Sequence, residues 1–136
     1  GDRVRKRVSS AFPQIDLGSF YVDLPERDRA AYAGIYVYAP QDRSVSLDAP
    51  DMIELRTGAD GGTKSFLNGE RIGRFEFVRE WVLDGDLLPG GPLRKGWNTL
   101  VVKLHKPSGA WRFGARFMTA AGDPATALEF TLTPPV

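Results

Sequence analysis

The sequence contains no cysteine and a single histidine. The absence of cysteine excludes disulfide bonds, thiolate metal sites and a cysteine nucleophile. The one histidine, His105, falls in a strand-like run, where histidine is more often a surface or packing residue than a general base. The motifs G-x-S-x-G, H-E-x-x-H and the P-loop are also missing. We therefore expect a protein that is not an enzyme.

The sequence also lacks an excess of either charge and any long apolar run. Lys and Arg number 18 against 17 Asp and Glu, which gives a formal net charge of +1. This balance provides no whole-molecule field for non-specific binding to nucleic acid. No run approaches the roughly 18 apolar residues that a membrane-spanning helix needs. We therefore expect neither nucleic acid nor a membrane as a partner.

The 136 residues suit one domain, and a domain of this size buries roughly two-thirds of the surface of its unfolded chain. Residues 1–10 carry four basic side chains before any apolar periodicity, and residues 134–136 read Pro-Pro-Val. We expect residues 1–10 to be a lead-in or linker, residues 11–133 a folded module and residues 134–136 a proline-rich end. Both ends then correspond to domain borders within a longer chain.

Glycine and proline, with 15 and 10 residues, separate short runs rich in β-branched and aromatic side chains. No run keeps a helical period over three turns, and one helical turn is expected at residues 25–32. Eight or nine mostly antiparallel strands with frequent turns predict an all-β sandwich of the jelly-roll kind. The strands are expected at residues 31–40, 43–49, 52–58, 63–67, 69–77, 97–106, 110–120 and 126–133.

Three turns decide how these strands pair. In the run SFLNGERIGR, residues 65–74, Asn68-Gly69 predicts a two-residue type I′ hairpin. Residues 58–62 are expected to form a second hairpin loop, and the turn across residues 106–109 is expected to pair residues 99–105 with residues 111–117. Because tryptophan is large and apolar, we expect both Trp97 and Trp111 in the core.

The order of three segments carries a family resemblance: GADGGTKSFLNGERIGR (58–74), LRKGWNTLVVKL (93–104) and WRFGARFMTAAGDP (111–124). Together they resemble the galactose-binding-like jelly-roll domains attached to bacterial carbohydrate-active enzymes. They are similar to the sugar-binding domain of β-galactosidase and β-glucuronidase relatives and to accessory domains of α-L-rhamnosidases. The resemblance covers about residues 30–120. It implies an accessory module of a larger exported bacterial protein, extracellular or periplasmic, that binds sugar or is purely architectural.

A sugar site needs aromatic rings for stacking and polar side chains for paired hydroxyls. We predict such a site in the rim loops around Arg74, Arg79, Glu80 and Trp81, although Trp81 would equally suit a cap on the end of the sandwich. If the strands around residues 103 and 113 pair, a basic strip also forms that could bind uronic acid or sulfate groups. Its members would be Lys103, His105, Arg112 and Arg116. Such a strip is more usually a solvated sheet face.

Two carboxylates are candidate metal ligands. Asp84 and Asp86, two residues apart, share one side of an extended segment. Calcium takes six to eight oxygen ligands, and the resemblance implies that such modules often hold a structural calcium, although no EF-hand pattern is present. The same pair does not suit a glycosidase, because two catalytic carboxyls must face each other across the bond.

The sequence as a whole predicts a non-catalytic carbohydrate-binding accessory module. Its partners would be an oligo- or polysaccharide and neighbouring domains of the same chain. Three alternatives stay open: a purely structural β-sandwich that packs between domains without a ligand, an enzyme that uses Asp84, Glu80 or His105, and a protein-interaction module that uses its basic residues 1–10.

Overall fold

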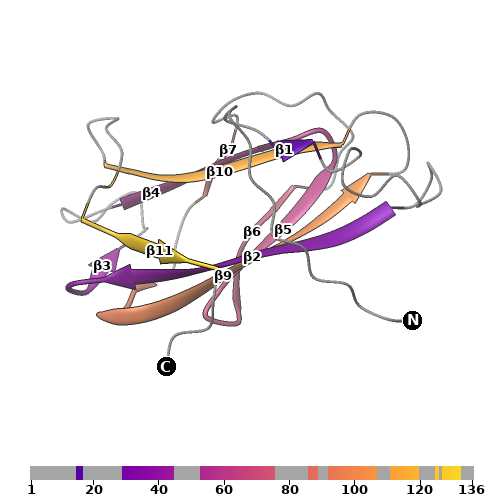
Figure 1. Ribbon diagram of the computed structural model, residues 1–136. Helices are drawn as coiled ribbons and strands as arrows, with labels where there is room; N and C mark the ends of the chain where they lie inside the picture. The colour runs from indigo at the N-terminus through magenta and orange to yellow at the C-terminus, as the bar shows by residue number, and fades with distance from the viewer. Residues whose placement is uncertain are drawn as a thin grey trace.

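The computed structural model describes eight parts of the chain, and every strand in them belongs to an antiparallel sheet. No helix occurs in these parts. Figure 1 shows a four-stranded and a five-stranded sheet stacked as two layers. The fold is therefore the all-β sandwich that the sequence predicts. The described residues are 15–16, 29–44, 53–75, 86–88, 92–106, 111–119, 125 and 127–132.

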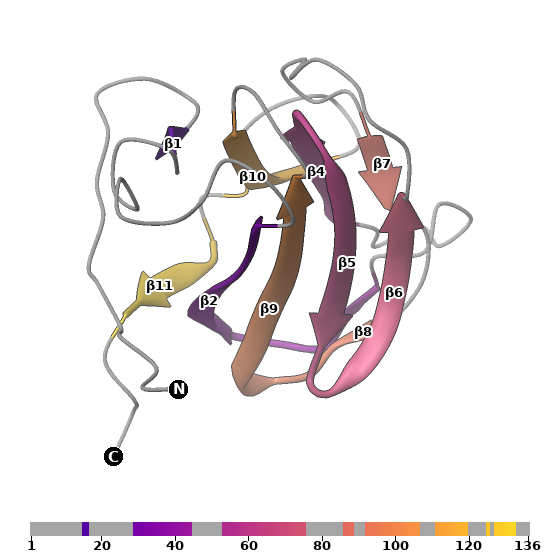
Figure 2. The same ribbon diagram turned by 90° about the vertical axis from the view of Figure 1, so that its right-hand side faces the viewer.

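The five-stranded sheet has the order β11-β2-β9-β5-β6, which Figure 2 shows from one side. Its strands are β2 (Arg29–Ala39), β5 (Gly62–Leu67), β6 (Glu70–Phe75), β9 (Gly96–Lys106) and β11 (Glu129–Thr131). The four-stranded sheet has the order β1-β10-β4-β7, with β1 (Ile15–Asp16), β4 (Ile53–Ala59), β7 (Asp86–Leu88) and β10 (Arg112–Thr119). A small ladder joins β3 (Arg43–Ser44) to β8 (Pro92–Leu93).

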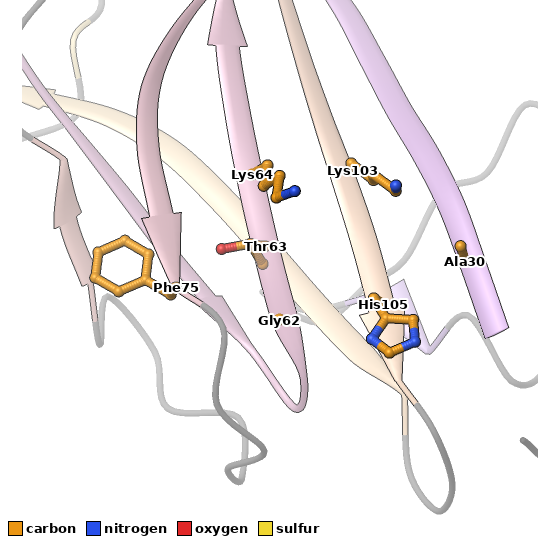
Figure 3. A pocket seen from close by; sticks show the side chains of 7 residues that line it. All are labelled: Ala30, Gly62, Thr63, Lys64, Phe75, Lys103 and His105. Atoms are coloured by element: carbon orange, nitrogen blue, oxygen red, sulfur yellow. The ribbon is translucent and has the colours of Figure 1, made fainter. Parts of the chain in front are cut away.

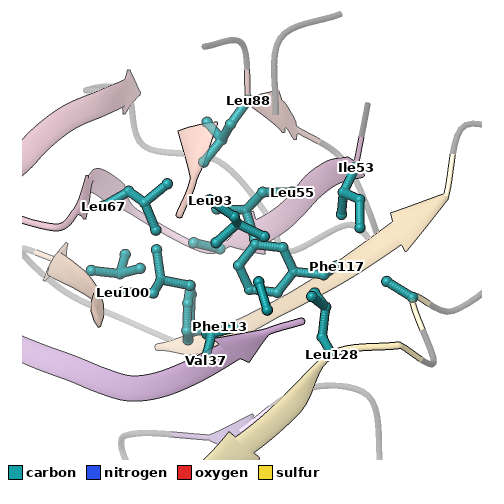
Figure 4. Close-up of a cluster of buried hydrophobic side chains, with 14 of the residues drawn as sticks. Val37, Ile53, Leu55, Leu67, Leu88, Leu93, Leu100, Phe113, Phe117 and Leu128 are labelled. Carbon is teal, nitrogen blue, oxygen red and sulfur yellow. The ribbon is translucent and has the colours of Figure 1, made fainter. Parts of the chain in front are cut away.

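The hydrophobic core lies between the two sheets (Figure 4). Alternate residues of β9 point inward, as the period of two in this run predicts. They are Leu100, Val102 and Leu104, all at most 4% exposed. From the other sheet, Leu55 and Phe117 meet them, and Trp111 is buried as expected.

The hairpin in SFLNGERIGR forms as predicted. Asn68 and Gly69 have φ angles of 51° and 84°, the two positive values that a type I′ turn requires. The turn joins β5 to β6, and the register shifts between Ser65 and Phe66. Such a β-bulge bends the edge strand and increases its twist.

Asn98 ties this hairpin to the neighbouring strand β9. Its side chain is fully buried. Its Oδ1 accepts hydrogen bonds from Asn68 Nδ2 and from the Arg94 N–H, both at 2.9 Å. Its Nδ2 donates to the carbonyl oxygens of Val37, Arg94 and Gly96. The side chains of Asn68 and Asn98 therefore stabilise the fold directly.

The expected hairpin at residues 58–62 is wrong. These residues carry the chain from β4 in the four-stranded sheet to β5 in the five-stranded sheet. The crossing is held by Asp60, which is 2% exposed. Its carboxylate accepts hydrogen bonds from the backbone N–H, Nε and Nη2 of Arg112 at 2.7, 2.8 and 2.9 Å. A loop with turn residues thus connects two layers rather than two neighbouring strands.

The expected pairing of residues 99–105 with residues 111–117 is also wrong. Strand β9 pairs with β2 and β5, whereas β10 pairs with β1 and β4. The helical turn expected at residues 25–32 is wrong for residues 29–32, which begin β2. Residues 25–28 lie outside the described part of the chain.

Candidate functional site

The outer face of the five-stranded sheet carries the strongest candidate site. Facing residues in an antiparallel pair lie on the same side of the sheet. Because Leu100, Val102 and Leu104 point into the core, their alternate neighbours on β9 point outward. These outward positions face partners on β2 and β5, so three strands contribute to one surface. From β9 they are Trp97, Thr99, Val101, Lys103 and His105.

Aromatic rings are prominent on this outer face. Tyr32 is 65% exposed and Trp97 is 44% exposed. Tyr38 faces Trp97 across the strands, and the two ring centroids lie 5.3 Å apart in an edge-to-face arrangement. The expectation that Trp97 belongs to the core is therefore wrong. Asn98 takes the inward position beside it, and this leaves Trp97 on the outer side.

A row of three cations crosses the same face. In register, Tyr32 faces Lys103, Lys103 faces Lys64, and Lys64 faces Arg74. We call Lys103, Lys64 and Arg74 the cationic row. Lys103 Nζ lies 6.0 Å from the centroid of the Tyr32 ring, within the range of a cation–π interaction. The row therefore places positive charge directly beside an exposed aromatic ring.

A cavity of about 370 Å³ opens beside the cationic row (Figure 3). Lys64 and Lys103 line it from neighbouring strands, and His105 lies next along β9. Thr63 also contributes to the lining, but it faces Leu104 and Phe75, so its buried side chain lies on the core side of β5. The complete lining comprises Ala30, Gly62, Thr63, Lys64, Phe75, Lys103 and His105.

The residues predicted for the rim site are only partly described. Arg74 is exposed near the end of β6 and belongs to the cationic row. Arg79, Glu80 and Trp81 lie outside the described residues, so their role as a sugar site stays a prediction.

The predicted basic strip does not exist as one surface. Lys103 and His105 lie on β9 in the five-stranded sheet, whereas Arg112 and Arg116 lie on β10 in the four-stranded sheet. The guanidinium of Arg112 forms the ion pair with Asp60. The strip does not form because β9 and β10, although consecutive in sequence, belong to different sheets.

The predicted calcium ligands are not brought to a described site. Asp84 lies outside the described residues, and Asp86 begins β7. In the part of the chain that the structure describes, no group of three or more His, Asp or Glu residues could hold a metal ion. The same part contains no helix that could cross a membrane.

Sequence reasoning missed Lys64 and Tyr32 as site residues. The alternation within residues 63–67 gives the two faces of β5, but not which strand lies beside it. Only the pairing of β9 with β5 brings Lys64 opposite Lys103. The signal in the sequence that could have found Tyr32 and Lys103 is the alternation along β2 and β9, which places both residues on the face opposite the core.

Comparisons with models of protein families, with curated proteins and with solved structures find no match for this chain. The function must therefore be inferred from the side chains on the outer face.

Proposed function

We propose that this chain is a non-catalytic carbohydrate-binding accessory module of a larger exported bacterial protein, with a jelly-roll topology. Its ligand, an oligo- or polysaccharide, lies on the outer face of the five-stranded sheet. The binding involves no covalent step and uses stacking and hydrogen bonds.

The exposed rings of Tyr32 and Trp97 carry this proposal. Large aromatic side chains that a strand presents to solvent lose the hydrophobic stabilisation that burial would give them. Tyr32 and Trp97 come from the two strands with the longest shared ladder, so their backbones are held firmly. Rings on a rigid sheet can stack on the C–H faces of a sugar with little loss of conformational entropy.

Polar groups on the same face support the proposal as well. The cationic row and the Thr99 side chain lie between or beside the rings and could bond sugar hydroxyls. The resemblance to galactose-binding-like domains agrees with this chemistry. A shallow face buries little of a ligand, so we expect weak affinity for a single sugar.

The second candidate is a structural domain that only packs against its neighbours. The observation in its favour is that Asn68 and Asn98, which carry much of the resemblance, are used to hold the fold. In that case Tyr32 and Trp97 would be covered by an adjacent domain of the same chain.

A glycan screen with Trp97 variants tests the proposal. The purified chain is applied to neutral, uronic and sulfated glycans, and hits are measured by calorimetry. Trp97→Ala is expected to weaken binding by at least about tenfold, as for an interface tryptophan at a binding hot spot. Trp97→Phe keeps a ring and is expected to lose less.

Each result has a distinct meaning when the urea midpoint shows that both variants are folded. Loss with Trp97→Ala and partial retention with Trp97→Phe supports binding on the outer face. Loss with Trp81→Ala alone would move the site to the predicted rim. Absence of binding to every glycan would contradict the proposal and favour the structural candidate.

A further inference from the structure

We infer that Asn68, in the turn between β5 and β6, is a latent modification site. The folded hairpin protects its side-chain amide from deamidation, and opening of the hairpin permits conversion to aspartate or isoaspartate. The inference goes beyond the proposed function and holds whether or not the outer face binds a glycan. It follows from the chemistry of the Asn68-Gly69 dipeptide and from the hydrogen bonds that hold the Asn68 side chain.

Deamidation is a reaction between the Asn68 side chain and the backbone of the next residue. The Gly69 nitrogen loses its proton to water or hydroxide and bonds to Asn68 Cγ, while the Cγ–Nδ2 bond breaks and ammonia leaves. Water then opens the five-membered imide. Attack of water at Cγ gives aspartate, and attack at the backbone carbonyl carbon gives isoaspartate, in which the chain runs through the former side chain.

Gly69 provides the access that this reaction needs. It is exposed, and a Cβ added there would meet no atom within 4 Å. Because glycine has no Cβ, nothing crowds the attacking nitrogen. Asn98 is the only other asparagine in the chain, and it is followed by the β-branched Thr99. Asn68 is therefore the more reactive of the two asparagines whenever the chain is open.

The conformation of the turn keeps the attacking nitrogen away from the amide. Asn68 and Gly69 have the positive φ angles of a type I′ turn. In such a turn the first central residue has a ψ angle of about 30°, which places the next nitrogen nearly opposite Cβ across the Cα–C bond. Ring closure needs this nitrogen on the same side as Cβ. Cyclisation therefore requires the turn to open.

Strand β9 holds both polar atoms of the Asn68 amide. Its Nδ2 donates to Asn98 Oδ1, and its Oδ1 accepts a hydrogen bond from the Thr99 N–H, both at 2.9 Å. The Asn68 N–H donates to the Thr99 carbonyl at 2.8 Å, so the side-chain oxygen replaces a backbone carbonyl where the ladder of β5 and β9 continues beyond Leu67. Rotation of Cγ toward Gly69 breaks both side-chain hydrogen bonds. The side chain and the turn thus protect the same carbon.

The product cannot restore this arrangement. An ionised carboxylate has no donor for Asn98 Oδ1, so two acceptor oxygens face each other. Turning the Asn98 amide over gives no relief, because its Nδ2 already donates to the carbonyl oxygens of Val37, Arg94 and Gly96. Isoaspartate also lengthens the backbone of a two-residue turn. Modification therefore weakens the contact of the hairpin with β9 irreversibly.

The first test compares the folded and the unfolded chain. The purified chain is incubated at mildly alkaline pH in buffer and in urea above its unfolding midpoint, and peptide mass spectrometry follows the exchange of each amide for a carboxyl. We expect Asn68 to deamidate in urea and to react at least about a hundredfold more slowly in buffer, where the hairpin must first open. Asn98 is the control in the same sample and is expected to stay unmodified. Equal rates in the two solutions, or no reaction of Asn68 in urea, would overturn the inference.

The second test asks whether the hydrogen bonds to β9 give the protection. Asn98→Ala removes the partner of Asn68 Nδ2. Gly73→Ala is the control, because it perturbs the packing of the same hairpin on Leu88 and keeps both Asn68 side-chain hydrogen bonds. The two variants are compared at urea concentrations that give them equal free energies of unfolding. We expect Asn68 to deamidate about tenfold faster in Asn98→Ala, and equal rates would overturn the protective role of Asn98.

The third test measures the effect of the product through Asn68→Asp. By urea denaturation, we expect this substitution to raise the ratio of unfolded to folded chain by about tenfold. In the Asn98→Ala background, where no Oδ1 faces the carboxylate, we expect less than about threefold. An equal effect in both backgrounds would contradict a modification that acts through Asn98. The first test needs no variant, so it decides the inference even if Asn98→Ala does not fold.

Discussion

At the scale of single residues, buried polar side chains determine how the loops of this sandwich are held. Asp60 fixes the crossing between the two sheets through Arg112. Asn98 fixes the start of β9 against the Asn68 turn. Asp60 and Asn98 both lie in the segments that resemble sugar-binding modules. The side chain of each, however, makes its hydrogen bonds within the chain. Their presence therefore specifies the architecture, and the ligand must be inferred from other side chains.

Asn98→Ala tests the structural role of the motif. The variant leaves the Arg94 N–H and three carbonyl oxygens without their side-chain partner in a buried place. We expect the free energy of unfolding, measured by urea denaturation, to fall by about 3 kcal/mol. Thr99→Ala, the neighbour on the outer face, should cost less than about 1 kcal/mol. An equal, small effect of both substitutions would show that the network adds no stability.

At the scale of strands, the sequence predicts the faces of individual elements better than their partners. The alternation of Leu100, Val102 and Leu104 places the three residues on one face of β9, which the structure buries, and the hairpin that Asn68-Gly69 predicts is confirmed. Both depend on residues close in the chain. The hairpins predicted at residues 58–62 and after Lys106 are wrong because turn residues alone do not distinguish a hairpin from a crossing between sheets.

Trp97 shows a second kind of error at this scale. The period of two in β9 already placed it opposite Leu100, but its size and hydrophobicity outweighed the phase in the prediction. The alternation along a strand can place a large apolar residue on the outward face although its hydrophobicity favours burial. Such a residue is a candidate for ligand contact. The same reasoning would have selected Tyr32, which lies opposite Ala33 and Val37 on β2.

Gly73→Ala tests the packing of the edge strand β6 on β7. An added Cβ at position 73 would clash with Leu88 Cδ2, and Leu88 is completely buried. Because Leu88 is packed in the core and must shift to admit the methyl group, we expect a loss of about 1–3 kcal/mol in urea unfolding.

Gly34→Ala is the control for this substitution. At position 34 an added Cβ meets no atom closer than 3.8 Å, and the position is exposed on the outer face. We expect a change within about 0.5 kcal/mol. Equal losses at both glycines would show that strand propensity, and not the contact with Leu88, determines the effect.

At the scale of the whole molecule, the described parts form a sandwich whose two outer faces differ in character. The five-stranded sheet presents Tyr32, Trp97 and the cationic row. Among the described residues, none of the exposed large apolar side chains lies on a strand of the four-stranded sheet. This difference could not be read from the sequence, because it depends on which strands share a sheet. It is the reason for assigning binding to one face.

Mapping the ligand contacts by NMR tests this assignment most directly. The ¹⁵N-labelled chain is titrated with the glycan that binds best in the screen, and amide shifts are followed residue by residue. We expect the largest changes on β2, β9 and β5, around Tyr32, Trp97 and Lys103, and little change on β10 and β4. Shifts centred on β10 and β4, or no shifts with any glycan, would contradict carbohydrate binding on the outer face of the five-stranded sheet.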